Sequence, residues 1–271
     1  MAVRIEKDGP VWTVIHDRPG ARNAMDPESA DALTAAFLKF DADEDACVAV
    51  FYGAGGAFCA GWDLKYVSTL DADYPLGELD ISTAWPRGNG GDIPRGPLGP
   101  SRLELDKPVI AAIEGPAVAG GMELGLWCDF RVMAQGSYFG VYCRRWGVPL
   151  IDGGTVRLPR LVGQGRALEI ILTGRKVPAE ECLTIGLCEY LTPKGGARAK
   201  AEELAREIAR FPQVCVRADR RSAIRSHGLG VREALIQEWY NGRGALIADG
   251  VAGAGRFKAG LGRHGDFGKI R

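Results

Sequence analysis

The chain has 271 residues, enough for one large domain or for one domain with an appendage. Its 34 basic and 34 acidic residues cancel, which argues against a nucleic-acid partner and against a charged membrane surface. Seven cysteines without a Cys-x-x-Cys pair and only three histidines disfavour disulfides and a metal site. The N-terminus lacks a secretory pattern, and no apolar run approaches the roughly 20 residues that cross a bilayer, so we expect a cytoplasmic protein with no membrane partner.

The N-terminal quarter predicts strands alternating with a helix. Apolar and polar residues alternate over 3–5 and 11–15 on either side of a glycine-proline turn, which predicts a β-hairpin. His16 follows the second strand; it could be catalytic, but an isolated histidine at a strand end is more often a surface or hydrogen-bonded structural residue. Asp26, followed by proline, is typical of a helix N-cap, and residues 47–52 read as a buried strand.

A glycine-rich stretch, GAGGAFCAGWDL, follows over residues 53–64. Its glycines miss the G-x-G-x-x-G spacing of a dinucleotide-binding turn, so a nucleotide cofactor is disfavoured. Composition alone would make it a loop between a strand and a helix. Residues 65–105 are so rich in glycine and proline that no long helix can persist there.

The most informative stretch is PVIAAIEGPAVAGGMELGLWCDFR, residues 108–131. A β-rich apolar run at 109–113 leads through a Gly-Pro break to the pair Gly120-Gly121 and then to a short helix carrying Glu123. A helix N-terminus presents unpaired N–H groups and the positive end of the helix dipole, and glycine allows a ligand to approach closely. An oxyanion site beside a carboxylate base suits chemistry next to a carbonyl group.

The rest of the chain becomes helical. A strand is predicted at 130–134, helices at 163–173 and 179–185, and a last strand at 187–191. Amphipathic helices follow at 199–210 and 231–247, and we expect their apolar faces to pack against another subunit. We therefore divide the chain into an α/β core, residues 1–195, and a C-terminal helical region, residues 196–271.

Three stretches together resemble the enoyl-CoA hydratase/isomerase, or crotonase, family: AGGAFCAGWDL, KPVIAAIEGPAVAGGMELGLWCDFRV and GGTVRLPRLVGQGRALEIILTGRKVPAEECLTIGL. The similarity covers about residues 11–191. It implies an α/β fold, a crotonase-like spiral of ββα units with a C-terminal helical trimerisation region. It also implies an acyl-CoA substrate, coenzyme A being part of that substrate with no further cofactor, and a homotrimer or dimer of trimers.

The resemblance also implies roles for individual residues. The backbone N–H groups of Ala60 and Gly120 would form an oxyanion hole, and Glu123 would be the principal base or acid. Substrate-binding positions would be Gly61, Asp63, Gly121 and Cys143, with Asp63 serving mainly to fix its turn. Aromatic residues that could line the acyl pocket, or simply pack, are Trp62, Tyr66 and Trp85.

The chain departs from the hydratase pattern at one position. Where related hydratases have a second glutamate, this chain has Cys143. A thiol, with a pKa of about 8.5, is a poor proton shuttle at neutral pH unless nearby charge lowers that pKa. Arg144 and Arg145 could do so, but solvated arginines and an inert buried thiol are the simpler interpretation. A nucleophilic Cys143 remains conceivable.

Asp152 is the candidate substitute for the missing glutamate. It could act as the second acid or base across the substrate from Glu123, or it could be the N-cap of a helix that begins near Gly153. We expect an enoyl-CoA hydratase-like lyase that adds water to a 2-enoyl-CoA thioester. An isomerase or thioester hydrolase of the same fold, or a non-catalytic acyl-CoA binder, is the alternative.

Overall fold

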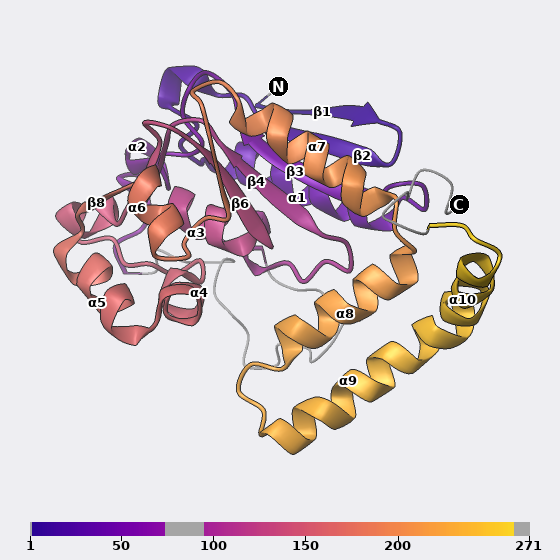
Figure 1. Cartoon of the computed structure of the whole chain (residues 1–271). Coiled ribbons are helices and arrows are strands. Elements are labelled where there is room, and N and C mark those ends of the chain that lie inside the picture. Colours follow the sequence, from indigo (N-terminus) through magenta and orange to yellow (C-terminus); the bar gives the residue numbers. More distant parts are fainter. Residues whose placement is uncertain (1, 74–94, 263–271) are drawn as a thin grey trace.

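The computed structural model describes residues 2–73 and 95–262 (Figure 1). Its main sheet has six strands in the order β1-β2-β3-β4-β6-β9. Only β1 and β2 pair antiparallel, and the other neighbours are parallel. These strands are β1 (Val3–Asp8), β2 (Val11–His16), β3 (Val48–Gly53), β4 (Val109–Ile113), β6 (Phe130–Ala134) and β9 (Tyr190–Thr192).

A second sheet of three short strands lies beside the first. Its order is β5 (Pro116–Val118), β7 (Tyr138–Gly140) and β8 (Lys176–Pro178). The first pair is parallel and the second antiparallel. Only two residues, Glu114 and Gly115, separate β4 from β5. The chain therefore passes directly from the first sheet to the second before it enters the helix that begins at Gly120.

Ten helices lie in the described residues. They are α1 (Pro27–Ala42), α2 (Leu64–Val67), α3 (Gly120–Trp127), α4 (Gly154–Val162), α5 (Gln164–Thr173), α6 (Ala179–Thr184), α7 (Ala197–Ala209), α8 (Gln213–Arg225), α9 (Val231–Ala245) and α10 (Val251–Lys258). The described residues also contain the 3₁₀ turns η1 (Pro19–Ala21), η3 (Pro100–Arg102) and η4 (Tyr142–Trp146), and a π-helical turn, η5 (Leu246–Gly250), links α9 to α10.

The main sheet is covered on both faces, as a parallel sheet must be. Alternate strand residues point to opposite sides, so Phe51 and Ile113 pack with α1 and α3, whereas Val50 and Ile110 pack under α7. The side chain of Asp26 accepts the amide hydrogen of Ser29 at 2.9 Å, which confirms the predicted N-cap of α1.

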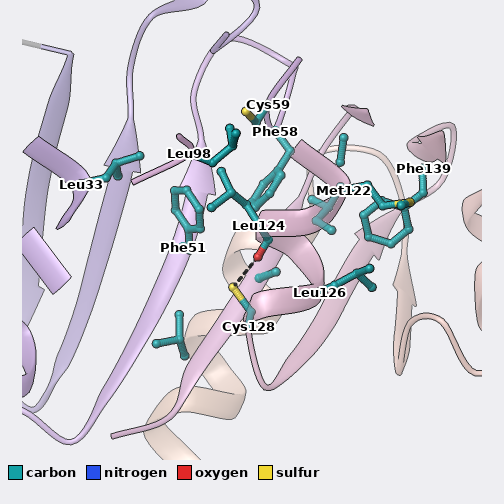
Figure 2. Close-up of a cluster of buried hydrophobic side chains, with 14 of the residues drawn as sticks. Leu33, Phe51, Phe58, Cys59, Leu98, Met122, Leu124, Leu126, Cys128 and Phe139 are labelled. Carbon is teal, nitrogen blue, oxygen red and sulfur yellow. Dashed lines mark hydrogen bonds between the residues drawn. The ribbon is translucent and has the colours of Figure 1, made fainter. Parts of the chain in front are cut away.

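Helix α3 is the most deeply buried helix of the site region. Figure 2 shows Met122, Leu124 and Leu126 projecting from it into a cluster that includes Phe58 of the glycine-rich stretch and Phe139 of β7. The thiol of Cys128 lies 3.4 Å from the Leu124 carbonyl oxygen and closes the last turn. Since apolar contacts surround α3, its N-terminus is held in a fixed position relative to the two sheets.

The C-terminal helices do not form one layer. Helix α7 packs on the sheet, and the carboxylate of Glu114, directly after β4, accepts the amide hydrogens of Gly195 at 2.9 Å and Ala197 at 2.6 Å. Helices α8, α9 and α10 extend away from the sheet (Figure 1). The division at residues 195 and 196 therefore stays a prediction. Within residues 2–73 and 95–262, no helix has both the length and the apolar character needed to cross a membrane.

Candidate active site

A cavity of about 80 Å³ lies where the glycine-rich stretch, α3, η4 and the turn before α4 meet. Its wall is mostly apolar, with one thiol and two carboxyl groups. It is formed by Ala60, Trp62, Leu64, Leu98, Ala119, Gly120, Glu123, Tyr142, Cys143, Trp146, Val148, Pro149, Ile151 and Asp152. Of the predicted site residues, the structure thus brings Ala60, Gly120, Glu123, Cys143 and Asp152 to one cavity.

Two of the main-chain amides at this cavity that have no acceptor among the described residues belong to turns that touch each other. One is Gly120, the first residue of α3, whose N–H has no carbonyl within the helix to bind. The other is Trp62. The N–H of Ala60 donates to the Arg22 carbonyl at 3.1 Å, so the predicted oxyanion donor at Ala60 is wrong. The free amide lies two residues further along the same turn.

Two glycines allow these turns to approach each other. A Cβ on Gly61 would lie 3.0 Å from the Gly120 nitrogen and 2.8 Å from the Ala119 Cβ, and one on Gly121 would overlap the Cys59 carbonyl. Ala119 itself has φ 55° and ψ −125°, a strained conformation for a residue with a Cβ. Gly61 and Gly121 are not among the residues lining the cavity, so their observed role is close packing rather than contact with the cavity.

Glu123 is buried, with 2% of its surface exposed. Its Oε1 accepts the amide hydrogens of Asp152 at 2.9 Å and Gly154 at 2.8 Å, bonds in which Oε2 takes no part. The pKa of Glu123 is raised to about 8, first by burial and then by the neighbouring negative charge of Asp152, although the two amide hydrogen bonds lower it. A carboxyl group with a pKa this close to neutrality can both give and take a proton.

Asp152 is equally buried, with 2% of its surface exposed. Helix α4 begins at Gly154 with Gly153 as N-cap and has no side-chain cap, so the alternative interpretation of Asp152 as an N-cap is wrong. Its Oδ1 accepts hydrogen bonds from the Leu98 amide, at 3.2 Å, and from the Ser101 hydroxyl. Its Oδ2 is buried without a hydrogen-bond partner in the described chain, and burial raises the pKa of Asp152.

Cys143 lies in η4 on the cavity wall, and its thiol stays protonated at neutral pH. Burial raises its pKa, and the charge of Glu123 raises it further. The charge of Arg144 lowers this pKa but does not outweigh burial, and its Nε donates to the Ile171 carbonyl at 2.8 Å. Arg145 instead stacks 3.9 Å from the centre of the Tyr142 ring. The suggestion that Arg144 and Arg145 activate the thiol is therefore wrong.

Asp63 lies away from the cavity and fixes its turn. One carboxylate oxygen accepts the Lys65 amide hydrogen at 3.0 Å, and the other binds Arg18 at 2.7 Å. Trp62 lines the cavity, whereas Tyr66 contacts the Trp62 ring from outside, with centroids 6.3 Å apart. Trp85 lies outside the described residues.

Sequence reasoning missed two groups of residues at this site. Leu98, which lines the cavity, and Ser101 both bind Asp152, and both come from the glycine- and proline-rich stretch, where no pattern marks them. Arg157 in α4 donates to the carbonyl oxygens of Asp152 at 2.9 Å and Ser101 at 2.8 Å. In the sequence, only its position about one helical turn after Asp152 could have indicated that Arg157 belongs to the site.

The fold and cavity define a class, an α/β protein with two sheets in which a buried carboxyl group at a helix N-terminus faces an apolar pocket. The sequence profile of the enoyl-CoA hydratase/isomerase family matches residues 6–85 and 101–227. The chain belongs to this family, also called the crotonase family, and has its fold. The family acts on acyl-CoA substrates.

Individual relatives are similar over most of their length. The enoyl-CoA hydratase EchA19 of Mycobacterium tuberculosis is 34% identical over 252 residues, 90% of this chain and 88% of that protein. The carnitinyl-CoA dehydratase of Salmonella typhi is 33% identical over 222 residues, 80% of this chain and 78% of the relative. The crystal structure of the enoyl-CoA hydratase EchA1 from Mycobacterium marinum has a TM-score of 0.84 and 30% identity, covering 95% of this chain and 96% of that one.

Proposed function

We propose that the protein is an enoyl-CoA hydratase-like lyase that adds water to the double bond of a 2-enoyl-CoA thioester. The observation that carries this proposal is the meeting of two buried carboxyl groups, Glu123 and Asp152, in one cavity beside two main-chain amides that have no acceptor in the described chain. The hydratase and dehydratase names of the relatives support the same reaction class.

The amides of Gly120 and Trp62 would bind the thioester oxygen. Their turns are in contact, since a Cβ on Gly61, the residue before Trp62, would lie 3.0 Å from the Gly120 nitrogen. As water adds to the β-carbon, the thioester oxygen gains the negative charge of an enolate. Donors fixed toward that charge stabilise it by about 3 kcal/mol each. The buried, positively polarised start of α3 favours the same charge.

The two carboxyl groups would divide the proton transfers. One carboxylate takes a proton from water as the hydroxyl oxygen bonds to the β-carbon, and the π electrons move to the thioester oxygen. The other carboxyl group then gives its proton to the α-carbon, so that water is added with no net change in charge. This requires one shared proton on the pair, and the raised pKa values of Glu123 and Asp152 favour that state near neutral pH.

Cys143 takes no proton in this scheme, because its thiol remains protonated. The scheme uses only acid–base groups and amides, so we propose that coenzyme A enters as part of the substrate and that no further cofactor is needed. We also propose a cytoplasmic location, since all seven cysteines are unpaired, as expected in a reducing compartment.

The test is the hydration of crotonyl-CoA, followed by the loss of absorbance of its conjugated thioester. We expect Glu123→Gln and Asp152→Asn each to lower kcat by about 10²- to 10⁴-fold, because each removes a proton-transfer group with little change of shape. Glu44→Gln, an exposed carboxyl group in the loop after α1, is the matched control. Full activity of the Glu123→Gln variant would refute the proposal, as would binding of the thioester without turnover by the wild type.

One observation favours a second candidate, the isomerisation of 3-enoyl-CoA to 2-enoyl-CoA. Moving a double bond needs only one carboxylate to carry a proton from one carbon to another, and Cys143 stands where related hydratases have their second glutamate. In this case 3-enoyl-CoA would gain the conjugated absorbance, Glu123→Gln would abolish the gain, and Asp152→Asn would leave most of it.

A further inference from the structure

The carboxyl group of Asp152 is held by a loop that lies far from it in the sequence. The Leu98 amide donates to Oδ1 at 3.2 Å, and the Ser101 hydroxyl donates to the same oxygen. Ser101 is 1% exposed and Asp152 2% exposed, so water does not compete for these bonds. Because both donors act on Oδ1, Oδ2 is left as the buried oxygen without a partner in the described chain.

The loop itself is tightly constrained. Gly96 and Gly99 exchange two backbone hydrogen bonds, at 3.0 and 2.9 Å. A Cβ on Gly96 would overlap the Ser101 hydroxyl and Asp152 Oδ1, so the loop backbone touches the pair it holds. Gly99 has φ +73°, and a Cβ there would meet the Ala30 carbonyl of α1. The position of Ser101 is therefore fixed by backbone packing against α1.

Arg157 joins the same two segments through their main chains. Its guanidinium donates to the Ser101 carbonyl at 2.8 Å and to the Asp152 carbonyl at 2.9 Å. Ser101 and Asp152 are thus held together twice, by their side chains and by a shared arginine. A guanidinium presents its donors in a rigid fork, which suits it to hold two carbonyl groups at a fixed spacing.

We propose that Ser101 is a positioning residue for Asp152, and that its hydroxyl group occupies Oδ1 so that Oδ2 is the oxygen that receives or gives a proton in the cavity. This inference rests on the proposed function, since it assigns Asp152 a part in proton transfer. The same loop also forms part of the cavity. The Leu98 amide binds Oδ1 of Asp152, and the Leu98 side chain lines the cavity over Gly120.

Several charged or titratable groups act on Asp152 from the elements around it: Glu123 of α3, Arg102 of η3, Arg157 of α4 and the buried thiol of Cys59. Burial raises the pKa of Asp152, whereas the hydrogen bond from Ser101 is the first of the contributions that lower it. Removal of the hydroxyl group should consequently raise that pKa further and displace Oδ1 from its fixed position.

The decisive experiment follows the carboxyl band of Asp152 by isotope-edited infrared titration, assigned as the band that Asp152→Asn removes. We expect Ser101→Ala to move the midpoint to higher pH and Ser101→Thr, which keeps the hydroxyl group, to restore it. The matched control is Ser137→Ala, which removes another hydroxyl group that is 1% exposed and hydrogen-bonded, to the Ala134 carbonyl at 2.7 Å. An unmoved midpoint in a folded Ser101→Ala protein overturns the inference.

Kinetics provide the second readout. With crotonyl-CoA, Ser101→Ala should lower kcat on the order of tenfold with KM little changed, a smaller loss than that of a proton-transfer group itself. The acidic limb of the pH profile should move in the same direction as the infrared midpoint. If no enoyl-CoA is turned over by the wild type, the proposed function fails, while the infrared titration still decides whether Ser101 controls Asp152.

Discussion

His16 is a residue whose ionisation should limit the stability of the protein in acid. Its side chain is fully buried at the end of β2, and neither ring nitrogen has a partner in the described chain. Burial lowers the pKa of His16 from 6.5 to about 4. The prediction that it is structural stands untested, but it is neither exposed nor hydrogen-bonded as such histidines usually are.

The expected result is that the contribution of His16 to stability falls as the pH falls. The His16 side chain takes up a proton near pH 6.5 in the unfolded chain but only near pH 4 in the folded chain. Its protonation therefore favours the unfolded state increasingly across this window. The contribution of neutral His16 is complete above pH 6.5 and declines by about 3 kcal/mol on reaching pH 4. Urea unfolding of the wild type and of His16→Phe at several pH values measures this contribution as the difference between their two slopes. An equal slope in both proteins would contradict the prediction.

The residues of the site differ in how far the sequence could predict them. Glu123 and Gly120 follow from a local pattern, a strand, a glycine turn and a short helix, and both line the cavity. The Ala60 error has a physical cause, because which amide of a turn is free depends on the Arg22 carbonyl 38 positions earlier in the chain. Asp152 was ambiguous for the same reason, since its partner Ser101 lies in a stretch without a periodic pattern.

At the scale of elements, the glycine-rich stretch, residues 53–64, packs so closely against α3 that a side chain added at their contact should destabilise the protein. A Cβ on Gly121 would overlap the Cys59 carbonyl, which is backbone and cannot rotate away. We expect Gly121→Ala to lower the free energy of unfolding by roughly 3 kcal/mol through overpacking, and to reduce activity by separating the two amides. Denaturant unfolding and crotonyl-CoA turnover measure the two effects.

The control for this substitution lies in α5. Gly165 is also helical, and a Cβ there would meet nothing within 4 Å. Gly165→Ala should therefore stabilise the protein by about 0.4–1 kcal/mol, because alanine restricts the unfolded chain more than glycine does. If both substitutions had similar effects on stability, close packing would not explain the glycine at position 121.

Elements with local signals were predicted well. The hairpin of β1 and β2, strands β4 and β6, and the N-cap of α1 all occur where patterning and turn residues indicated them. The last strand is shorter than expected. It begins at Tyr190 rather than at residue 187, because the amides of Leu187 and Cys188 both donate to the Cys182 carbonyl and end α6 instead. The three-residue strands of the second sheet carry too few residues for a period to be seen.

At the scale of the whole molecule, α9 presents an apolar face that the described chain leaves uncovered. Val231, Leu235, Ile236, Trp239 and Tyr240 line one groove and are each more than half exposed. Exposed apolar side chains gathered on one face are typical of subunit interfaces. We propose that this face is buried in the homotrimer or dimer of trimers that the sequence resemblance implies.

Disruption of this face should therefore dissociate the protein. Leu235→Arg together with Trp239→Arg places two charges in the groove, and we expect a particle near the 29.0 kDa of one chain by light scattering coupled to gel filtration. The control is Glu238→Lys, an exposed charged residue of α9 that does not line the groove. A wild-type protein that is already monomeric would refute the proposed interface.

The crowding of Ala119 against Gly61 restricts how this part of the molecule can evolve. Because a methyl group at position 61 would lie 2.8 Å from the one already present at position 119, the two positions together have room for a single methyl group. Substitutions at these two positions are therefore limited to smaller residues, whereas Trp146 and Val148 contribute apolar side chains to the cavity wall. New substrate preferences should consequently arise in that wall while the amide pair stays unchanged.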